Sequence, residues 1–467
     1  MRKTKIICTI GPATNSYEML KKLQQSGMNI ARVNMSHGDH ASHKIVLDHI
    51  KKINQESKFP VATLLDTKGP EIRTGDLKEP MTLTQGMLVA VSVDDSLRTE
   101  YPLIYVTYQD MVKSMNIGNT VILDSGLINL KVLEKYEKHL ICEVTDGGIL
   151  KGRRHVNLPG TRVNLPSVTD KDKEDIRFGL QNDVDFIAMS FVRSAEDIWE
   201  LKGFLGEDRH RVKIIAKIEE QEGLKNAYEI ARAADGIMVA RGDLGIEIEI
   251  EDIPNVQRQL VEMCAKLGKR VIIATQLLET MIDNPIPTRA EVTDVSNAIT
   301  QEVDAVMLSG ETGVGKYPIK ALEQLGKIAK KTEQLPGMHL WASLEKLEDR
   351  HHMAAAAVKL ATDLQLKGIV VLTEFGKSAE RIINNRPRHS NIYAFTYLQK
   401  TYRTLSLYWG VVPFLTTYFD SPQDALSNAF EILKKSEGFK AGDRVVVFTD
   451  IFVKDRTVHS VQLYTLG

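Results

Sequence analysis

The feature that most constrains this chain is a series of eight short apolar runs, separated by longer polar or amphipathic segments. The runs are continuous rather than alternating, which is typical of parallel strands buried on both faces. They span Lys5–Ile10, Asn29–Met35, Val61–Asp66, Val184–Phe191, Val212–Glu219, Gly236–Arg241, Arg270–Thr275 and Asp304–Ser309. Eight such units predict an α/β fold in which a (β/α)8 barrel closes on itself. An open doubly wound sheet is the alternative, but no glycine-rich dinucleotide turn follows the first run.

The interval between the third and fourth runs interrupts this repeat. From Gly69 to about Ser167 the chain lacks a helical period, and β-rich pieces such as Met87–Val93 alternate with turn residues. We therefore expect an inserted all-β domain over residues 69–167, a small β-barrel. It would close as a lid over the mouth of the catalytic barrel formed by residues 1–68 and 168–335. An insertion without a function is the alternative interpretation.

The chain continues past the eighth run into a third unit. Gln334–Gly337 and the charged stretch after it are typical of a linker. Beyond them, apolar runs again alternate with helical segments, so residues 336–467 are predicted to form a smaller α/β domain. A length of 467 residues agrees with three domains.

Charge and cysteine content narrow the class of protein. The 60 basic and 61 acidic residues leave a formal net charge of -1, so no overall field favours nucleic acid or an anionic membrane as a partner. The three cysteines lack the paired spacing of zinc or redox motifs and fit a reducing compartment. The sequence has no signal-peptide core and no apolar run of about 18 residues, so we expect a cytoplasmic protein.

Polar residues at the ends of the predicted strands are the candidate site residues, because the loops at this face of a barrel carry its chemistry. On the second run, Arg32, Asn34 and Ser36 share one face, since side chains alternate along a strand. A guanidinium, an amide and a hydroxyl together suit an anionic ligand or a cation held by oxygens. A strand end that caps its own loop is the alternative.

The fifth run places Lys217 inside an apolar stretch and Glu219 two residues later on the same face. Burial of either charge is costly unless it is paired or meets a ligand. Two interpretations stay open: a structural ion pair, or a lysine that faces transferring negative charge beside a metal-binding carboxylate. Asp243 adds a carboxylate at the next strand end, and two carboxylates commonly hold magnesium with waters or substrate oxygens. Basic and acidic residues without a His or Cys nucleophile array indicate phosphoryl transfer.

Six motifs between residues 4 and 279 resemble those of pyruvate kinases, and the resemblance spans the whole chain. They are Thr4–Pro12 (TKIICTIGP), Arg32–Gly38 (RVNMSHG), Leu65–Arg73 (LDTKGPEIR), Ile215–Glu219 (IAKIE), Ala240–Gly245 (ARGDLG) and Ile273–Glu279 (IATQLLE). The resemblance implies transfer of the phosphoryl group of phosphoenolpyruvate to ADP, which gives pyruvate and ATP in the last step of glycolysis. It also implies Mg2+ and K+ as cofactors and a homotetramer.

The same resemblance implies a role for each matching residue. Lys217 would stabilise the phosphoryl group in the transition state, and Thr275 would lie near the face on which the enolate is protonated. The implied catalytic residues are Lys217, Arg32, Arg73 and Thr275. The implied substrate-binding residues are Arg32, Gly242, Asp243 and Thr275, and the nucleotide-binding residues are His37, Arg73 and Arg154. The implied metal ligands are Glu219 and Asp243 for magnesium, and Asn34, Ser36, Asp66 and Thr67 for potassium.

The implied need for potassium depends on Glu71. In the resemblance, a glutamate at this position goes with dependence on a monovalent cation, whereas a lysine supplies the missing positive charge internally. The alternative is that Glu71 only pairs with a neighbouring basic residue such as Lys68 or Arg73.

The C-terminal domain resembles an effector-binding and oligomerisation domain only in part. Thr373, Lys377 and Ser378 belong to a loop that would bind a phosphorylated allosteric effector at a helix N-terminus. Phe375 replaces a small residue in that loop, so a solvated loop is the alternative. Near the end of the chain, Asp450–Thr457 replaces a Gly/Pro-rich loop.

Two other function classes compete with this interpretation. A magnesium-dependent lyase or mutase on a phosphoenolpyruvate-binding barrel would share the carboxylates but would need neither a lid nor a nucleotide site. A catalytically silent protein that binds sugar phosphates is disfavoured, because Lys217 and Glu219 are intact. Glu220 and Ser125 depart from the family pattern without replacing a ligand, and Glu220 either alters the metal site or faces solvent.

Overall fold

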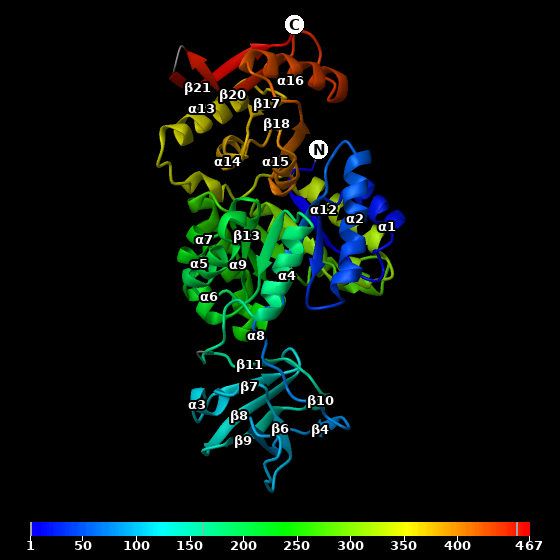
Figure 1. Cartoon of the computed structure of the whole chain (residues 1–467), viewed down its shortest axis with the longest axis vertical. Coiled ribbons are helices and arrows are strands. Elements are labelled where there is room, and N and C mark those ends of the chain that lie inside the picture. The colour runs from blue at the N-terminus through cyan, green and yellow to red at the C-terminus, as the bar shows by residue number, and fades with distance from the viewer. Residues whose placement is uncertain (1, 162, 454–455) are drawn as a thin grey trace.

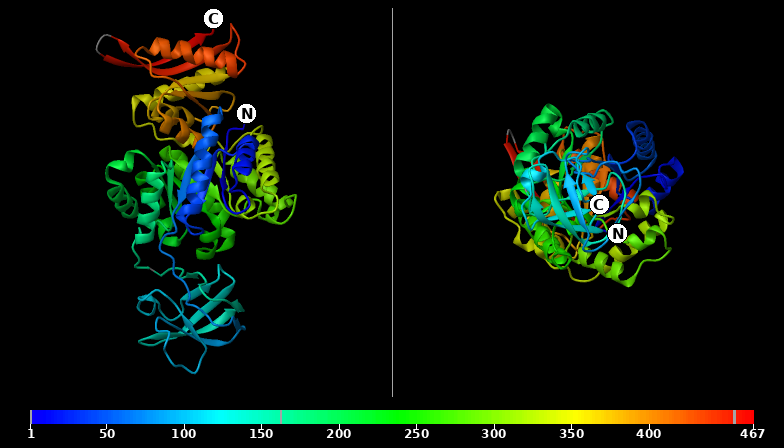
Figure 2. Two further views of the ribbon diagram at one scale, coloured as in Figure 1. Left: turned by 45° about the vertical axis from the view of Figure 1, so that its right-hand side comes forward. Right: turned by 90° about the horizontal axis from the view of Figure 1, so that it is seen from below.

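A computed structural model describes residues 2–161, 163–453 and 456–467, which form three units along one long axis (Figure 1). The barrel occupies the middle, a β-rich unit lies at one end and an α/β unit lies at the other (Figures 1 and 2). The chain leaves the barrel for the β-rich unit after β3 (Ala62–Asp66) and re-enters it before α4 (Asp170–Gln181). The β-rich unit therefore lies at the carboxyl ends of the barrel strands.

The predicted barrel is confirmed, because each of the eight predicted runs contains one strand of a closed parallel sheet. Around the barrel the strands follow the order β1-β16-β15-β14-β13-β12-β3-β2. Apolar side chains such as Leu64, Ile215 and Met238 are fully buried in its core. The remaining strands are β1 (Lys5–Thr9), β2 (Ile30–Asn34), β12 (Phe186–Met189), β13 (Lys213–Ile218), β14 (Gly236–Ala240), β15 (Arg270–Ala274) and β16 (Ala305–Leu308).

Helices surround this sheet and bury their apolar faces against it. Asp39 and Thr169 cap α2 and α4, since each side chain accepts a hydrogen bond from the backbone N–H three residues later. The barrel helices are α1 (Tyr17–Ser26), α2 (His40–Glu56), α4, α5 (Ala195–Leu205), α6 (Gln221–Lys225), α7 (Ala227–Ala233), α8 (Arg241–Glu247), α9 (Ile253–Leu267), α10 (Arg289–Thr300), α11 (Gly310–Gly313) and α12 (Pro318–Thr332). Short 3-10 helices span Gly206–His210, Ile250–Asp252, Glu279–Ile282 and Leu340–Ser343.

The inserted unit, called the lid below, is mainly β-structure. Six of its strands form one sheet in the order β11-β7-β8-β9-β5-β6, and β4 pairs with β10. The expected β-barrel is thus an open half-barrel, with one short helix, α3 (Met111–Ser114). The lid strands are β4 (Met81–Leu83), β5 (Leu88–Ser92), β6 (Leu103–Tyr105), β7 (Thr120–Leu123), β8 (Ile128–Lys135), β9 (His139–Asp146), β10 (Gly148–Leu150) and β11 (Val156–Asn157).

The C-terminal unit is a five-stranded sheet in the order β19-β18-β17-β20-β21. Its last two strands, β20 (Arg444–Val453) and β21 (Arg456–Thr465), form an antiparallel hairpin. The predicted loop Asp450–Thr457 therefore belongs largely to strands, and residues 454–455 lie outside the described residues. The other elements are α13 (Asp349–Asp363), β17 (Gly368–Leu372), α14 (Lys377–Ile383), β18 (Asn391–Thr396), α15 (Gln399–Thr404), a 3-10 turn (Leu405–Leu407), β19 (Val411–Leu415) and α16 (Pro422–Ser436).

Buried cations join the C-terminal unit to the amino ends of the barrel strands. The Lys5 ammonium donates a hydrogen bond to the Val411 carbonyl at 2.7 Å. Arg270 and Arg386 reach Asp304 at 2.9 and 3.1 Å. The lid and the C-terminal unit thus lie at opposite ends of the barrel. In the described part of the chain, the helices lack the length and apolar character that a membrane crossing requires.

Candidate active site

The Lys217 side chain lies at the centre of a charged cluster at the carboxyl ends of the barrel strands. Its ammonium nitrogen is 2.8 Å from Glu219 Oε1, 3.1 Å from Asp66 Oδ1 and 2.7 Å from Ser190 Oγ. The Lys217 side chain is almost fully buried, so two carboxylates compensate a charge that water cannot solvate. The ion pair left open by the sequence is present, and the lysine also faces the barrel mouth where a substrate could bind.

Arg32 is the second cation of this cluster. Its Nε lies 2.6 Å from Asp66 Oδ2, and one of its terminal nitrogens donates to Thr9 Oγ1 at 2.8 Å. Burial alone would raise the pKa of Asp66, but the charges of Arg32 and Lys217 outweigh burial and lower it below its ordinary value. Asp66 is therefore an ionised link between the two cations.

Glu219 faces Lys217 with one oxygen and the protein backbone with the other. The Phe191 N–H donates to Glu219 Oε2 at 2.7 Å. Burial raises the pKa of Glu219, and the charge of Asp243 adds to this effect against that of Lys217. A cation bound between Glu219 and Asp243 would relieve this unfavourable burial of negative charge.

These two carboxylates fit a magnesium ion that completes its coordination with water or substrate oxygens. Within the described ranges, no group of three or more His, Cys, Asp or Glu side chains is placed to hold a metal by itself. A site with a few protein ligands is typical of magnesium bound together with a phosphorylated substrate.

The predicted potassium ligands come from the ends of β2 and β3. Asn34 and Asp66 are partners in the parallel register of these strands. Asn34 Oδ1 accepts a hydrogen bond from the Ser36 N–H at 3.1 Å, and Thr67 Oγ1 donates to the Ala188 carbonyl at 3.3 Å. Amide, hydroxyl and carboxylate oxygens are thus gathered at one edge of the cluster, a donor set that suits a hard cation.

Thr275 and Gly242 meet at the ends of β14 and β15. The Gly242 N–H donates to Thr275 Oγ1 at 2.7 Å. A Cβ atom on Gly242 would lie 3.3 Å from that hydroxyl oxygen, so the close approach favours glycine. Asp243 follows in the first turn of α8. The predicted carboxylate-binding residues therefore lie together.

The predicted nucleotide-binding residues lie outside the Lys217 cluster. Arg73 donates two hydrogen bonds to Glu71 Oε2, at 2.8 and 2.6 Å. Arg154 lies 3.5 Å from Asp124 in the lid, and His37 is exposed on the loop after β2. Across residues 2–161, 163–453 and 456–467, no hydrogen bond or ion pair joins these three side chains to Lys217.

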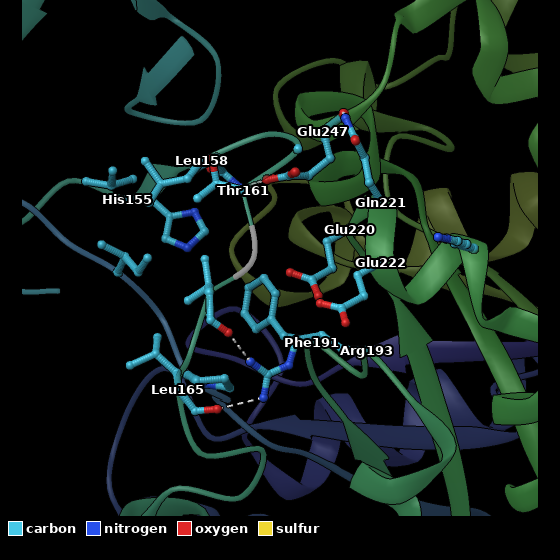
Figure 3. A pocket seen from close by; sticks show the side chains of 17 residues that line it. His155, Leu158, Thr161, Leu165, Phe191, Arg193, Glu220, Gln221, Glu222 and Glu247 are labelled. Atoms are coloured by element: carbon cyan, nitrogen blue, oxygen red, sulfur yellow. Dashed lines mark hydrogen bonds between the residues drawn. The ribbon is translucent and has the colours of Figure 1, made fainter. Parts of the chain in front are cut away.

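A cavity of about 430 Å³ lies between the lid and the barrel (Figure 3). Neither Lys217 nor Asp66 lines it, and it approaches their cluster through Phe191, whose N–H binds Glu219. Glu220 lines it together with Glu222 and Glu247, so its carboxylate faces the cavity rather than bulk solvent. Burial raises the pKa of Glu220 to about 8. Arg193 donates hydrogen bonds of 2.7 Å to two backbone carbonyls in the segment that returns from the lid. Arg193 therefore links the barrel to the segment that returns from the lid.

Three further residues shape this site, and none of them was predicted from the sequence to be a site residue. Ser190 connects Lys217 to the Thr67 carbonyl, Phe191 binds Glu219 through its N–H, and Arg241 is buried behind Thr275. Ser190 and Phe191 end the fourth predicted run, so the strand-end rule that found Lys217 could have found them too.

A second cavity, of about 600 Å³, lies in the C-terminal unit. Its lining includes the predicted effector residues Thr373, Lys377 and Ser378 together with Phe375, whose side chain is exposed. Gly376 adopts a left-handed conformation with φ 84° and leads into α14. The predicted loop thus borders a space large enough for a metabolite.

A (β/α)8 barrel with a lid and a mouth that combines paired cations with clustered carboxylates defines a phosphoryl-transfer enzyme. Residues 1–322 match the family "Pyruvate kinase, barrel domain", and residues 351–458 match "Pyruvate kinase, alpha/beta domain". The chain belongs to the pyruvate kinase family, and its activity is phosphoryl transfer from phosphoenolpyruvate to ADP.

Individual relatives agree with this assignment over the full chain. A pyruvate kinase of Staphylococcus aureus is 43% identical over 475 residues, which cover 100% of this chain and 81% of the relative. Plastidial pyruvate kinase 2 of Arabidopsis thaliana is 40% identical over 99% of this chain and 81% of its own length. The crystal structure of a pyruvate kinase from Cryptosporidium parvum superimposes with a TM-score of 0.94 at 36% identity, covering 100% of this chain and 96% of that one.

Proposed function

We propose that Lys217, Arg32, Arg73 and Thr275 carry the pyruvate kinase activity of this chain. The observation that supports this most directly is the position of Lys217, which lies between Asp66 and Glu219 beside Arg32. The lysine ammonium is fixed by three oxygen atoms and is shielded from water. A fixed charge in such a site stabilises developing negative charge without reorganisation.

The charge balance at the barrel mouth supports a need for added cations. Arg32 and Lys217 bring two positive charges, against the three carboxylates of Asp66, Glu219 and Asp243. Phosphoenolpyruvate adds a phosphate and a carboxylate to this site. Its binding is therefore unfavourable unless further positive charge accompanies it.

The pyruvate kinase family typically uses Mg2+ and K+. In this chain Glu219 and Asp243 would hold Mg2+, while Asn34, Ser36, Asp66 and Thr67 would hold K+. Bound Mg2+ would polarise the phosphoryl oxygens and offset their charge. Lys217 and Arg32 orient the phosphoryl group between them, and Lys217 keeps its proton throughout because two carboxylates face it.

The end of β15 would bind the opposite end of the substrate. The backbone of Gly242 and Asp243 and the hydroxyl of Thr275 would hold the substrate carboxylate. Loss of the phosphoryl group leaves an enolate, whose methylene carbon takes up a proton to give pyruvate. Thr275 would lie beside the face on which this proton arrives, and ADP receives the phosphoryl group on the side of His37, Arg73 and Arg154.

The remaining proposals concern regulation and organisation. The catalytic barrel would comprise residues 1–68 and 168–335, the lid 69–167, and the effector and oligomerisation domain 336–467. A phosphorylated effector would bind at Thr373, Lys377 and Ser378, which is supported by the cavity that they line. A homotetramer is supported by exposed apolar side chains, such as Leu463, on the edge strand β21.

Steady-state kinetics test this function. Pyruvate should form from phosphoenolpyruvate only when ADP and Mg2+ are present, with one ATP for each pyruvate. The Lys217→Met variant should lose this activity while its circular dichroism spectrum stays unchanged. Product formation from phosphoenolpyruvate without ADP would instead support the lyase or mutase alternative.

A further inference from the structure

The turn after β15 contains two consecutive residues in an unusual backbone conformation. Thr275 has a φ of 64° and Gln276 a φ of 53°, so both lie in the left-handed region that favours glycine. Thr275 is also β-branched, which makes this conformation less favourable still. Each such residue costs conformational free energy and persists only where neighbouring groups hold it.

Arg241 contacts this turn directly. One of its terminal nitrogens donates to the Thr275 carbonyl at 2.8 Å and to the Gln276 carbonyl at 3.1 Å. Both carbonyls of the strained turn are therefore bound by a single guanidinium group.

The other terminal nitrogen of the guanidinium contacts two of the helices that surround the barrel. It donates to Asp294 Oδ1 on α10 at 2.7 Å and to Gln257 Oε1 on α9 at 3.3 Å. The Arg241 side chain is only 6% exposed, so water hardly reaches these contacts. The planar guanidinium group of Arg241 thus links the turn to α9 and α10.

These contacts of Arg241 also determine where the Thr275 hydroxyl lies. Thr275 Oγ1 donates to the Ala274 carbonyl and accepts the Gly242 N–H, each at 2.7 Å. Gly242 is the residue directly after Arg241. Arg241 therefore fixes both partners of the Gly242–Thr275 hydrogen bond. It is the chain neighbour of Gly242, and it binds the carbonyls of the turn that contains Thr275.

We propose that Arg241 is a positioning residue for the reaction, which acts on the substrate only through Thr275 and Gly242. It holds the turn in its left-handed conformation, so that the Thr275 hydroxyl and the start of α8 face the substrate carboxylate together. This inference rests on the proposed role of Thr275 at the substrate. Lysine cannot replace Arg241, since an ammonium group lacks the planar fork that spans both sides.

A double-mutant cycle with Thr275→Ala and Arg241→Ala tests the inference, with kcat and KM for phosphoenolpyruvate as readouts. We expect Arg241→Ala to lower kcat/KM by about 10- to 100-fold, because a small displacement of a positioned group has an effect of this size. In the Thr275→Ala background, Arg241→Ala should lower kcat/KM by less than about three-fold, since the effects of residues that act through one another are not additive.

Two further measurements separate positioning from general damage to the fold. Guanidinium ion at low millimolar concentration should restore part of the kcat/KM of Arg241→Ala, because it can occupy the space left by the side chain. Arg270→Ala is the control, since Arg270 is also a buried arginine and lies at the start of β15, the strand that ends at the Thr275 turn. We expect the thermal midpoint of Arg270→Ala to fall. Guanidinium should not restore the kcat/KM of this variant. Arg241→Lys, which retains a charge beside Asp294, should fold and still show the loss.

The outcomes distinguish this inference from the proposed function. Losses that multiply in the double variant, or an Arg241→Lys enzyme with wild-type kinetics, overturn the positioning role alone. If Thr275→Ala itself has wild-type kinetics, the proposed role of Thr275 fails and the role of Arg241 fails with it.

Discussion

The Lys217 ammonium lies 2.8 Å from the carboxylate of Glu219, two residues further along the chain at the end of β13. Asp66 approaches the same ammonium from a different strand, at 3.1 Å. The lysine therefore belongs at once to an ion pair and to the surface on which the phosphoryl group is expected. A bound phosphoryl group would compete with Glu219 and Asp66 for the positive charge of Lys217. A metal ion could partly neutralise these carboxylates.

Replacement of Lys217 by methionine should lower kcat by about 100- to 1000-fold, because a fixed charge at the transferring group is lost. Methionine has a similar length and Arg32 still pairs with Asp66, so the fold should remain intact. Lys213→Met is the matched control, since Lys213 lies at the opposite end of the same strand and pairs with Asp235. Steady-state assays and circular dichroism check both variants, and near-normal turnover of Lys217→Met would contradict the role.

The proposed magnesium site predicts a second pair of effects. Glu219→Gln and Asp243→Asn should each raise the Mg2+ concentration for half-maximal activity by about ten-fold or more, because a hard-cation site loses one of two carboxylates. Glu222→Gln provides a control, since Glu222 lines the neighbouring cavity. The measurement is a Mg2+ titration at saturating phosphoenolpyruvate and ADP. If both ligand variants titrate like the wild type, the assignment is wrong.

The sequence predicted the barrel well because every barrel strand is a mostly apolar run that is buried on both faces. The cluster around Lys217 was also predictable, since its members stand at strand ends and charged residues in apolar runs are conspicuous. The left-handed turn at Thr275 was not predictable, because Arg241 imposes it from a neighbouring strand end. The half-barrel shape of the lid likewise depends on pairing between distant strands, which local periodicity does not specify.

The effector proposal predicts that binding depends on Lys377. Calorimetric titration with sugar monophosphates, sugar bisphosphates and nucleoside monophosphates should show binding of at least one class to the wild-type enzyme. Lys377→Glu should weaken it by at least about ten-fold, because a charge beside the phosphate is reversed. Lys435→Glu is the control, since Lys435 is exposed on α16 and does not line the cavity. No binding, or equal binding to Lys377→Glu, would remove the support for this site.

Lys5 predicts how stability depends on pH. Burial lowers the pKa of Lys5 to about 7, and the charge of Arg2 adds to the effect. The unfolded state keeps an ordinary lysine pKa of about 10.4, so it binds more protons than the folded state between about pH 7 and 10. The cost of the buried charge is fully present below pH 7 and is relieved as the pH rises. The thermal midpoint of the wild type should therefore rise between pH 7 and 9 relative to that of Lys5→Met. Parallel midpoints in the two proteins would contradict this.

The last prediction concerns potassium and depends on Glu71. The ion pair that the alternative interpretation requires is present, since Glu71 Oε2 lies 2.6 Å from Arg73 and 3.4 Å from Lys68. The same pair occupies Arg73, so its charge is largely neutralised before a phosphorylated ligand arrives. A bound monovalent cation would supply the missing positive charge.

Activity should accordingly be low in a tetramethylammonium salt and rise when potassium replaces it at constant ionic strength. Glu71→Lys should blunt this response, because it frees Arg73 and adds an ammonium group in one step. Glu71→Gln separates the two effects, since it frees Arg73 without adding an ammonium group, and it should reduce the response less than Glu71→Lys does. Wild-type activity that is equally high without potassium or any other small monovalent cation would show that the ion pair alone explains Glu71.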